Sequence, residues 1–194
     1  MKSVTLKEIL PFQQYELLRP RLRPLFIAEK DRRRLAVCDH VTLLFENGQT
    51  VWYQVQEMLR TERIVVESAI RHELDTYNEL IPRSGEFVAT MLIEYADAAA
   101  RDSALRELVG LENHLWICLD SRRERARFDQ CQMSADRISS VQFVRFPLGG
   151  LDSGEFLALA GSGKIAIELD HPKLVARAPV NGILAYALAQ DLSE

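Results

Sequence analysis

The sequence lacks the long apolar segments of membrane and exported proteins. No apolar run approaches the roughly 20 residues that a membrane-spanning helix needs. The first residues, MKSVTLKEIL, contain neither a long apolar stretch nor the small-residue cleavage site of a signal peptide. These absences predict a cytoplasmic protein without a membrane-spanning segment.

Cysteine is also scarce. The chain contains three unevenly spaced cysteines, Cys38, Cys118 and Cys131, which do not make a disulfide framework. Zinc or an iron–sulfur cluster needs about four ligands, and C-x-x-C pairs are absent. In extended strands Cys38 would share a side with His40, and Cys118 with His114. We expect each cysteine to pack as a small apolar residue, with a Cys–His pair as the alternative and any redox role left open.

Common catalytic fingerprints are missing as well. No G-x-S-x-G, H-E-x-x-H or G-x-G-x-x-G occurs, so hydrolase, zincin and dinucleotide-binding functions lack support. Residues 161–164, Gly-Ser-Gly-Lys, lack the spacing of a phosphate-binding loop and precede a predicted strand where a helix is required. They indicate a helix end followed by a turn. The sequence therefore assigns no catalytic residue and no substrate, and whether the protein is an enzyme stays open.

What the chain does contain is an ordinary globular composition. Of its 194 residues, 47% are hydrophobic and 27% are charged, which suits one domain with a substantial core. No linker or internal repeat divides it, so we expect a single domain over residues 1–194. The net charge of −4 gives no global attraction to nucleic acid or to an anionic membrane, and it disfavours both as partners.

The N-terminal part, residues 1–82, is predicted to be rich in helix. Proline punctuates its helical candidates, which fall at 5–10, 11–18, 21–34, from Thr50 onward, and at 66–80. A β-run at 42–45 leads through Asn47-Gly48 into the helix at Thr50. Asn-Gly tolerates the positive φ of a tight turn, and we expect the Thr50 hydroxyl to cap the helix.

The C-terminal part, residues 83–194, is predicted to be rich in strand. Apolar and polar residues alternate at 86–95, 115–119, 126–129, 137–146 and 164–170, with the charged stretch 120–125 as an exposed hairpin loop. Such alternation indicates a sheet with one buried face. Helices near 97–109, 151–160 and 180–191 would cover that face. The expected fold class is α+β, a helical N-terminal third followed by a largely antiparallel β-sheet covered by helices.

Three helical carboxylates are candidate metal ligands. At ~100° per residue, Glu73 falls on the apolar arc of its helix and Glu29 lies among apolar residues of an earlier one, while Glu57 flanks the helix between them. A carboxylate on a core-facing stripe must be paired, ligated or protonated. Together with His40 they would bind a divalent metal such as iron, manganese or zinc. We favour ion pairs with arginines instead, Arg33 being the local partner of Glu29.

The densest charge cluster is basic and lies at residues 19–34. It consists of Arg19, Arg21, Arg23, Lys30, Arg32, Arg33 and Arg34. Few aromatic residues interleave with it, which counts against single-stranded nucleic acid. We expect a solvated helix face first. A surface through which Arg32, Arg33 and Arg34 bind an acidic partner protein is the next alternative, and nucleic acid is the third.

Three strings carry a resemblance to a known family. They are TLLFENGQTVWYQVQEMLRTERI from Thr42, HELDTYNEL from His72 and RISSVQFVRF from Arg137. On these strings the chain resembles, over nearly its whole length, a bacterial family known as domain of unknown function 3501. Its members tend to be encoded beside rubrerythrin-like and iron–sulfur oxidoreductase proteins, which implies work in oxidative stress or electron transfer. The resemblance implies no catalytic residues.

Two functions from different classes follow. The favoured one is a cytoplasmic accessory or interaction protein that acts with a rubrerythrin-like or iron–sulfur redox partner. The alternative is a metal-binding protein or metalloenzyme that uses Glu29, Glu57, Glu73 and His40.

Overall fold

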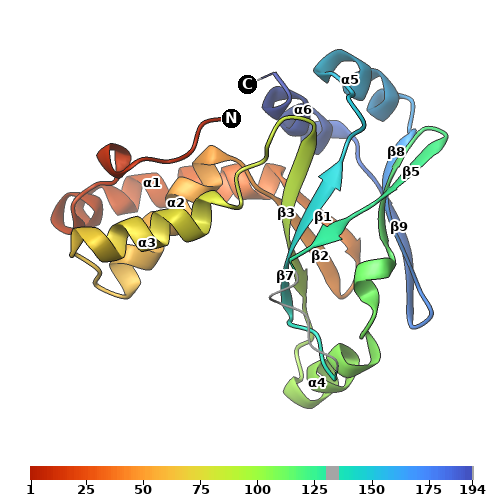
Figure 1. Cartoon of the computed structure of the whole chain (residues 1–194), viewed down its shortest axis with the longest axis horizontal. Helices are drawn as coiled ribbons and strands as arrows, with labels where there is room; N and C mark the ends of the chain where they lie inside the picture. Colours follow the sequence, from red (N-terminus) through yellow and green to blue (C-terminus); the bar gives the residue numbers. More distant parts are fainter. Residues whose placement is uncertain (130–135, 194) are drawn as a thin grey trace.

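The computed structural model of the chain describes residues 1–129 and 136–193, so Cys131 lies outside the described residues. It consists of a helical arm and a body built on two β-sheets (Figure 1). The helical arm contains η1 (Leu6–Glu8), α1 (Phe12–Arg32), α2 (Gly48–Thr61) and α3 (Glu67–Asn78). The body adds α4 (Ala98–Glu107), η2 (Leu111–Asn113), α5 (Ser153–Gly161) and α6 (Gly182–Asp191) to the sheets. The α+β fold class is confirmed.

Helix α1 runs through Pro20, which was expected to separate two helices. Pro20 and Pro24 lie inside it, so the segments predicted at 11–18 and 21–34 form one helix. Proline removes one backbone donor and strains the preceding turn. Packing offsets this cost, since the Phe26 ring stacks on Trp52 and Tyr53 of α2 at 5.4 and 4.6 Å between ring centroids.

The Asn47-Gly48 pair begins α2 and does not form a separate tight turn. Asn47 is the N-cap residue, and its side-chain oxygen accepts hydrogen bonds from the amides of Gln49 and Thr50 at 3.0 and 2.9 Å. The Thr50 hydroxyl accepts from the Asn47 amide at 2.9 Å and so completes a capping box. The cap thus lies three residues before the predicted one, because the asparagine side chain reaches the free amides of the first turn.

The strands form two antiparallel sheets, where one was expected. The first contains, in spatial order, β1 (Arg34–Cys38), β2 (Val41–Phe45), β3 (Glu86–Ile93), β7 (Val141–Pro147) and β6 (Arg127–Phe128). The second contains β5 (Arg122–Arg125), β4 (Leu115–Leu119), β8 (Ile165–His171) and β9 (Leu174–Pro179). They meet where β1 contacts β9, and where β5 continues into β6 with Ala126 donating its amide to the Leu115 carbonyl at 2.9 Å.

One apolar core fills the space between the two sheets. The alternation predicted from the sequence is confirmed on both, since Phe87, Ala89 and Met91 of β3 and Ile167 and Leu169 of β8 are buried in the same cluster. Helices α5 and α6 close one end of this core and α4 lies at the other (Figure 1). The helices therefore cover the ends of the core, while the sheets bury much of their apolar surface against each other.

Two strands of the second sheet were not predicted from the sequence. The stretch predicted as a loop at 120–125 contains β5, and β9 was not predicted at all. Neither strand has a continuous apolar face, because both lie at the edges of their sheet and expose most side chains. Among the described residues, no helix is both long and apolar enough to cross a membrane.

Candidate functional site

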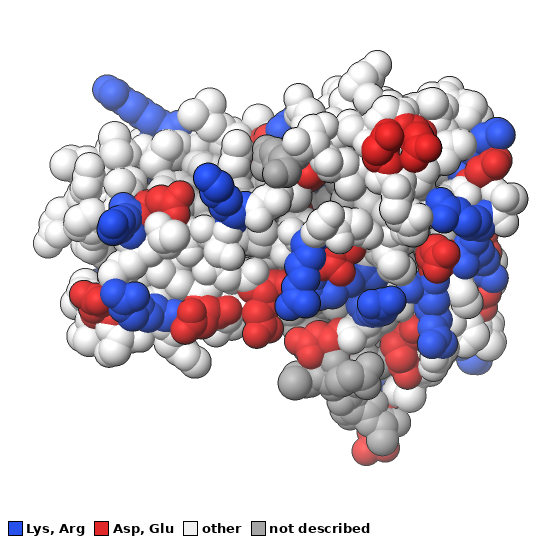
Figure 2. All heavy atoms as spheres, turned by 45° about the horizontal axis from the view of Figure 1, so that its top comes forward, with Lys and Arg blue, Asp and Glu red and all other residues white. Residues whose placement is uncertain are grey.

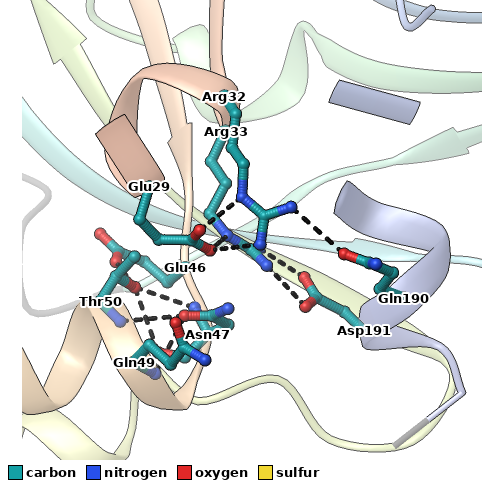
Figure 3. A network of polar contacts seen from close by, with 9 residues as sticks. All are labelled: Glu29, Arg32, Arg33, Glu46, Asn47, Gln49, Thr50, Gln190 and Asp191. Atoms are coloured by element: carbon teal, nitrogen blue, oxygen red, sulfur yellow. Dashed lines mark hydrogen bonds and ion pairs between the residues drawn. The ribbon is translucent and has the colours of Figure 1, made fainter. Parts of the chain in front are cut away.

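The end of α1 is fixed to α6 by a buried ion pair. Arg33, whose side chain is 1% exposed, donates two hydrogen bonds to the Asp191 carboxylate at 2.6 and 2.8 Å (Figure 3). Glu29 accepts from Arg33 and Arg32, and Arg32 also donates to the Gln190 side chain at 3.2 Å. We call these five residues the polar joint.

The charges of the polar joint stabilise one another. Burial opposes ionisation of Glu29, but hydrogen bonds from Arg32 and Arg33 outweigh it and hold the pKa of Glu29 below its ordinary value. Burial likewise opposes the charge of Arg33, yet Asp191 and Glu29 raise the Arg33 pKa. The expected Arg33–Glu29 contact is confirmed.

The joint also decides what the basic cluster can do. Arg33 is a core residue, which corrects its expected place on a solvated or partner-binding face, and Arg32 is bound to Glu29 and Gln190. Arg34 is exposed on β1, and its side chain makes no hydrogen bond or ion pair among the described residues. Of the three arginines proposed for a partner, only Arg34 is both exposed and free.

A second polar group lies beside the joint, at the start of α2 (Figure 3). The Glu46 side chain, 1% exposed, accepts hydrogen bonds from the Thr50 and Thr90 hydroxyls at 2.5 and 2.6 Å. Sequence reasoning missed Glu46, although its place directly after an apolar strand was a signal. Glu46 joins α2 to β3 through Thr90 and so helps to hold the arm on the first sheet.

The four predicted metal ligands have separate surroundings. Glu57 accepts hydrogen bonds from Arg19 at 2.8 Å and from the Tyr15 hydroxyl at 2.6 Å. The Arg19 bond is the main cause that lowers the Glu57 pKa. His40 stacks on Tyr95 with 4.0 Å between ring centroids, and its Nδ1 lies 3.1 Å from a backbone carbonyl.

Glu73 differs from both expectations placed on it. It is half-buried on α3, and its side chain makes neither a hydrogen bond nor an ion pair among the described residues. Its negative charge does raise the pKa of the neighbouring Tyr77, after the larger effect of burial. The described part of the chain brings no three His, Cys, Asp or Glu side chains into an arrangement that could hold a metal ion.

The outer face of the second sheet carries a rigid polar cluster. The Asp170 carboxylate accepts hydrogen bonds from Arg123 at 2.7 Å and from Trp116 at 3.0 Å, and His114 Nδ1 lies 3.0 Å from the same oxygen as Trp116. These contacts, the Arg123 hydrogen bond first, lower the Asp170 pKa to about 2. The Arg123 guanidinium also lies over the Trp116 ring, 4.1 Å from its centroid.

Cys118 belongs to the same face but is poorly suited to nucleophilic attack. Its thiol lies 3.5 Å from Glu168 and contacts no histidine. Burial, and then the hydrogen bond to Glu168, raise the pKa of the Cys118 thiol, which disfavours the reactive thiolate. The arrangement matches the expectation of an apolar cysteine more closely than a Cys–His pair.

Four exposed arginines follow one another along β5 and β6. We call Arg122, Arg123, Arg125 and Arg127 the basic ribbon. Figure 2 shows many Lys and Arg side chains, with Asp and Glu side chains among them, over the part of the molecule that contains the strands. Sequence reasoning missed the ribbon as a site, although the string RRERAR was its signal.

Comparisons with known proteins identify a family and a similar fold, and the descriptions of both matches give the function as unknown. A family described as "Protein of unknown function (DUF3501)" matches residues 3–192. A crystal structure of a protein of unknown function from Burkholderia pseudomallei K96243 is 33% identical, with a TM-score of 0.87. That match covers 98% of this chain and 100% of the other. A search of curated proteins found no match.

Proposed function

The chain belongs to the family of proteins of unknown function DUF3501, and we propose that it is an accessory protein that binds an acidic partner through its basic ribbon. The observation that carries this proposal is a row of four exposed arginines on a chain whose net charge is −4. A local positive patch on an acidic protein favours association with carboxylates over nonspecific attraction to polyanions.

Most of the positive charge of the basic ribbon is not neutralised. Arg122 donates to the Gly149 carbonyl at 3.4 Å, and Arg125 to the Asn113 side chain at 3.1 Å. The Arg127 side chain makes no hydrogen bond or ion pair among the described residues. These three guanidinium groups remain available for bidentate bonds to carboxylates of a partner.

The fourth arginine supplies a preorganised contact. Arg123 is bonded to Glu168 and Asp170, each at 2.7 Å, and stacks on Trp116. Tryptophan and arginine dominate the binding energy of many interfaces. Because Arg123 and Trp116 are already held in place, a partner that docks on them loses little side-chain entropy.

The proposed partner is a cytoplasmic redox protein with an acidic surface. A rubrerythrin-like or iron–sulfur protein is the class that the family resemblance implies. The proposal therefore has two parts, the basic ribbon as the surface and a redox protein as the occupant, and each is tested separately.

The experiment measures binding to a purified rubrerythrin-like protein and a purified iron–sulfur oxidoreductase from the same organism. Arg125→Glu combined with Arg127→Glu should raise the dissociation constant, measured by biolayer interferometry, at least tenfold. Arg21→Glu combined with Arg23→Glu is the matched control, since both residues are exposed on α1 and the charge change is equal. Raising the salt concentration should weaken the wild-type complex, because exposed charge pairs are screened.

Three results would contradict the proposal. Equal losses in the two double variants would remove the basic ribbon as the surface. Absence of binding to both proteins would remove the redox partner. If an RNA oligonucleotide bound through the basic ribbon and neither protein bound, the partner would be nucleic acid and not an acidic protein.

Metal binding through Glu29, Glu57, Glu73 and His40 has less support, because arginines already occupy the Glu29 and Glu57 carboxylates. Elemental analysis of protein purified without chelator tests it directly. Stoichiometric iron, manganese or zinc that disappears in Glu73→Gln would favour that function over partner binding.

A further inference from the structure

A pocket of about 540 Å³ opens at the far end of the helical arm, away from the body. It lies between η1, the start of α1, and the adjoining ends of α2 and α3 (left in Figure 1). Its lining is mainly apolar and includes Leu6, Ile9, Leu59, Ile64 and Ile70. A concave apolar site of ~300–1,000 Å³ is the usual setting for a small ligand.

One buried polar side chain in this lining is without a partner among the described residues. Gln56 lies on α2, is 2% exposed, and its amide nitrogen makes no hydrogen bond within the described part of the chain. Buried amides are almost always hydrogen-bonded, so an exception calls for an absent acceptor. A ligand oxygen in the pocket would supply that acceptor.

The charged lining residues are already neutralised. Arg60 is paired with Glu16, and Glu67 with Arg71 at 2.6 Å. The remaining aromatic donor is also occupied, because the Tyr15 hydroxyl donates to Glu57. Apart from the exposed Gln13 side chain, the described lining residues therefore present an apolar wall and the free amide of Gln56, with no unpaired charge to attract an ion.

We propose that this pocket binds an uncharged, largely apolar small molecule whose carbonyl oxygen accepts a hydrogen bond from Gln56. The apolar wall contributes affinity by burial, and the amide orients the ligand by its single polar contact. This site is independent of the basic ribbon, because no residue is common to the two.

The test uses Prodan, an uncharged naphthalene ketone whose fluorescence shifts to the blue in apolar surroundings. Titration into the wild-type chain should give a saturable blue shift. Gln56→Leu keeps a similar volume but removes the donor, and it should weaken Prodan binding about tenfold. Val65→Trp should abolish binding by filling the mouth of the pocket, where Val65 is 69% exposed.

Val175→Trp is the matched control for Val65→Trp, because Val175 is equally apolar, 78% exposed, and lies on β9 in the body. It should bind Prodan as the wild type does. Equal binding by the wild type and Gln56→Leu would overturn the role of the carbonyl.

Binding that survives in Val65→Trp, or no saturable binding at all, would overturn the pocket as a ligand site. Sedimentation equilibrium tests whether a second copy of the chain occupies the pocket instead. A wild-type dimer that Val65→Trp converts to a monomer would make the pocket an interface between two copies of the chain.

Discussion

The helical arm and the body differ in the interactions that stabilise them. The body is built around one large apolar cluster to which both sheets and α4, α5 and α6 contribute. The arm has a smaller apolar cluster of its own, formed by residues such as Val51, Val55 and Leu74. Its attachment to the body includes apolar contact with Phe143 of β7 and the buried polar contacts of the joint at Arg33 and Asp191 and of Glu46.

This difference predicts different sensitivities. Apolar burial is non-directional and depends little on pH, so the body should respond mainly to changes in side-chain volume. Ion pairs and caps depend on geometry and protonation, so the arm should respond to the loss of single polar atoms. The comparison can therefore be tested with polar substitutions at the arm and its joint.

The largest effect is expected at the polar joint. Asp191→Ala leaves the Arg33 guanidinium buried without its main partner, and the free energy of unfolding should fall by roughly 3 kcal/mol. Urea denaturation followed by circular dichroism measures this change. Lys164→Ala is the control, because the Asp120–Lys164 pair is about half exposed and its loss should cost less than ~0.5 kcal/mol. Similar losses in both variants would show that the joint is not what holds the arm.

A smaller loss of stability is expected from substitutions at the two Asn-Gly pairs that begin α2 and α6. Asn47 caps α2 with two hydrogen bonds, whereas Asn181 occupies the N-cap position of α6 without any side-chain bond. Asn47→Ala should destabilise the protein by about 1–2 kcal/mol, and Asn181→Ala by less than about 0.5 kcal/mol. Thermal unfolding of both variants distinguishes them. Equal shifts in Tm would mean that the bonds at Asn47 contribute nothing to stability.

The smallest effect on stability is expected when acid protonates Glu57. The pKa of Glu57 in the folded protein lies below its ordinary value of 4.5, so its contribution is present at neutral pH and is lost as pH falls through the folded pKa. The difference in Tm between the wild type and Glu57→Gln should therefore narrow as pH falls from 7 to 3. Glu73→Gln, which removes a carboxylate without an ion pair among the described residues, is the matched control and should lower Tm at pH 7 by less than Glu57→Gln does. A Glu57→Gln offset that stays constant would contradict the stabilising role of the Arg19 contact.

The candidate sites show where sequence reasoning ends. The resemblance strings contain Glu46, Asn47 and Gln56, but only the fold reveals that Glu46 and Gln56 are buried, the first satisfied and the second not. Glu29 was correctly paired with Arg33 because helix periodicity places residues four apart on one side. The second partner of Arg33, Asp191, is 158 positions away, and no local pattern predicts such a contact.

By itself the sequence determined the α+β class, the family and the buried faces of β3, β4 and β8, because alternation with period two is a local property of each strand. Tertiary structure alone decided that the strands form two sheets and that α1 continues through its prolines. It also decided that Arg33 is buried while the four arginines of the basic ribbon stay exposed. These outcomes depend on contacts between distant segments, whose energies outweigh local preference.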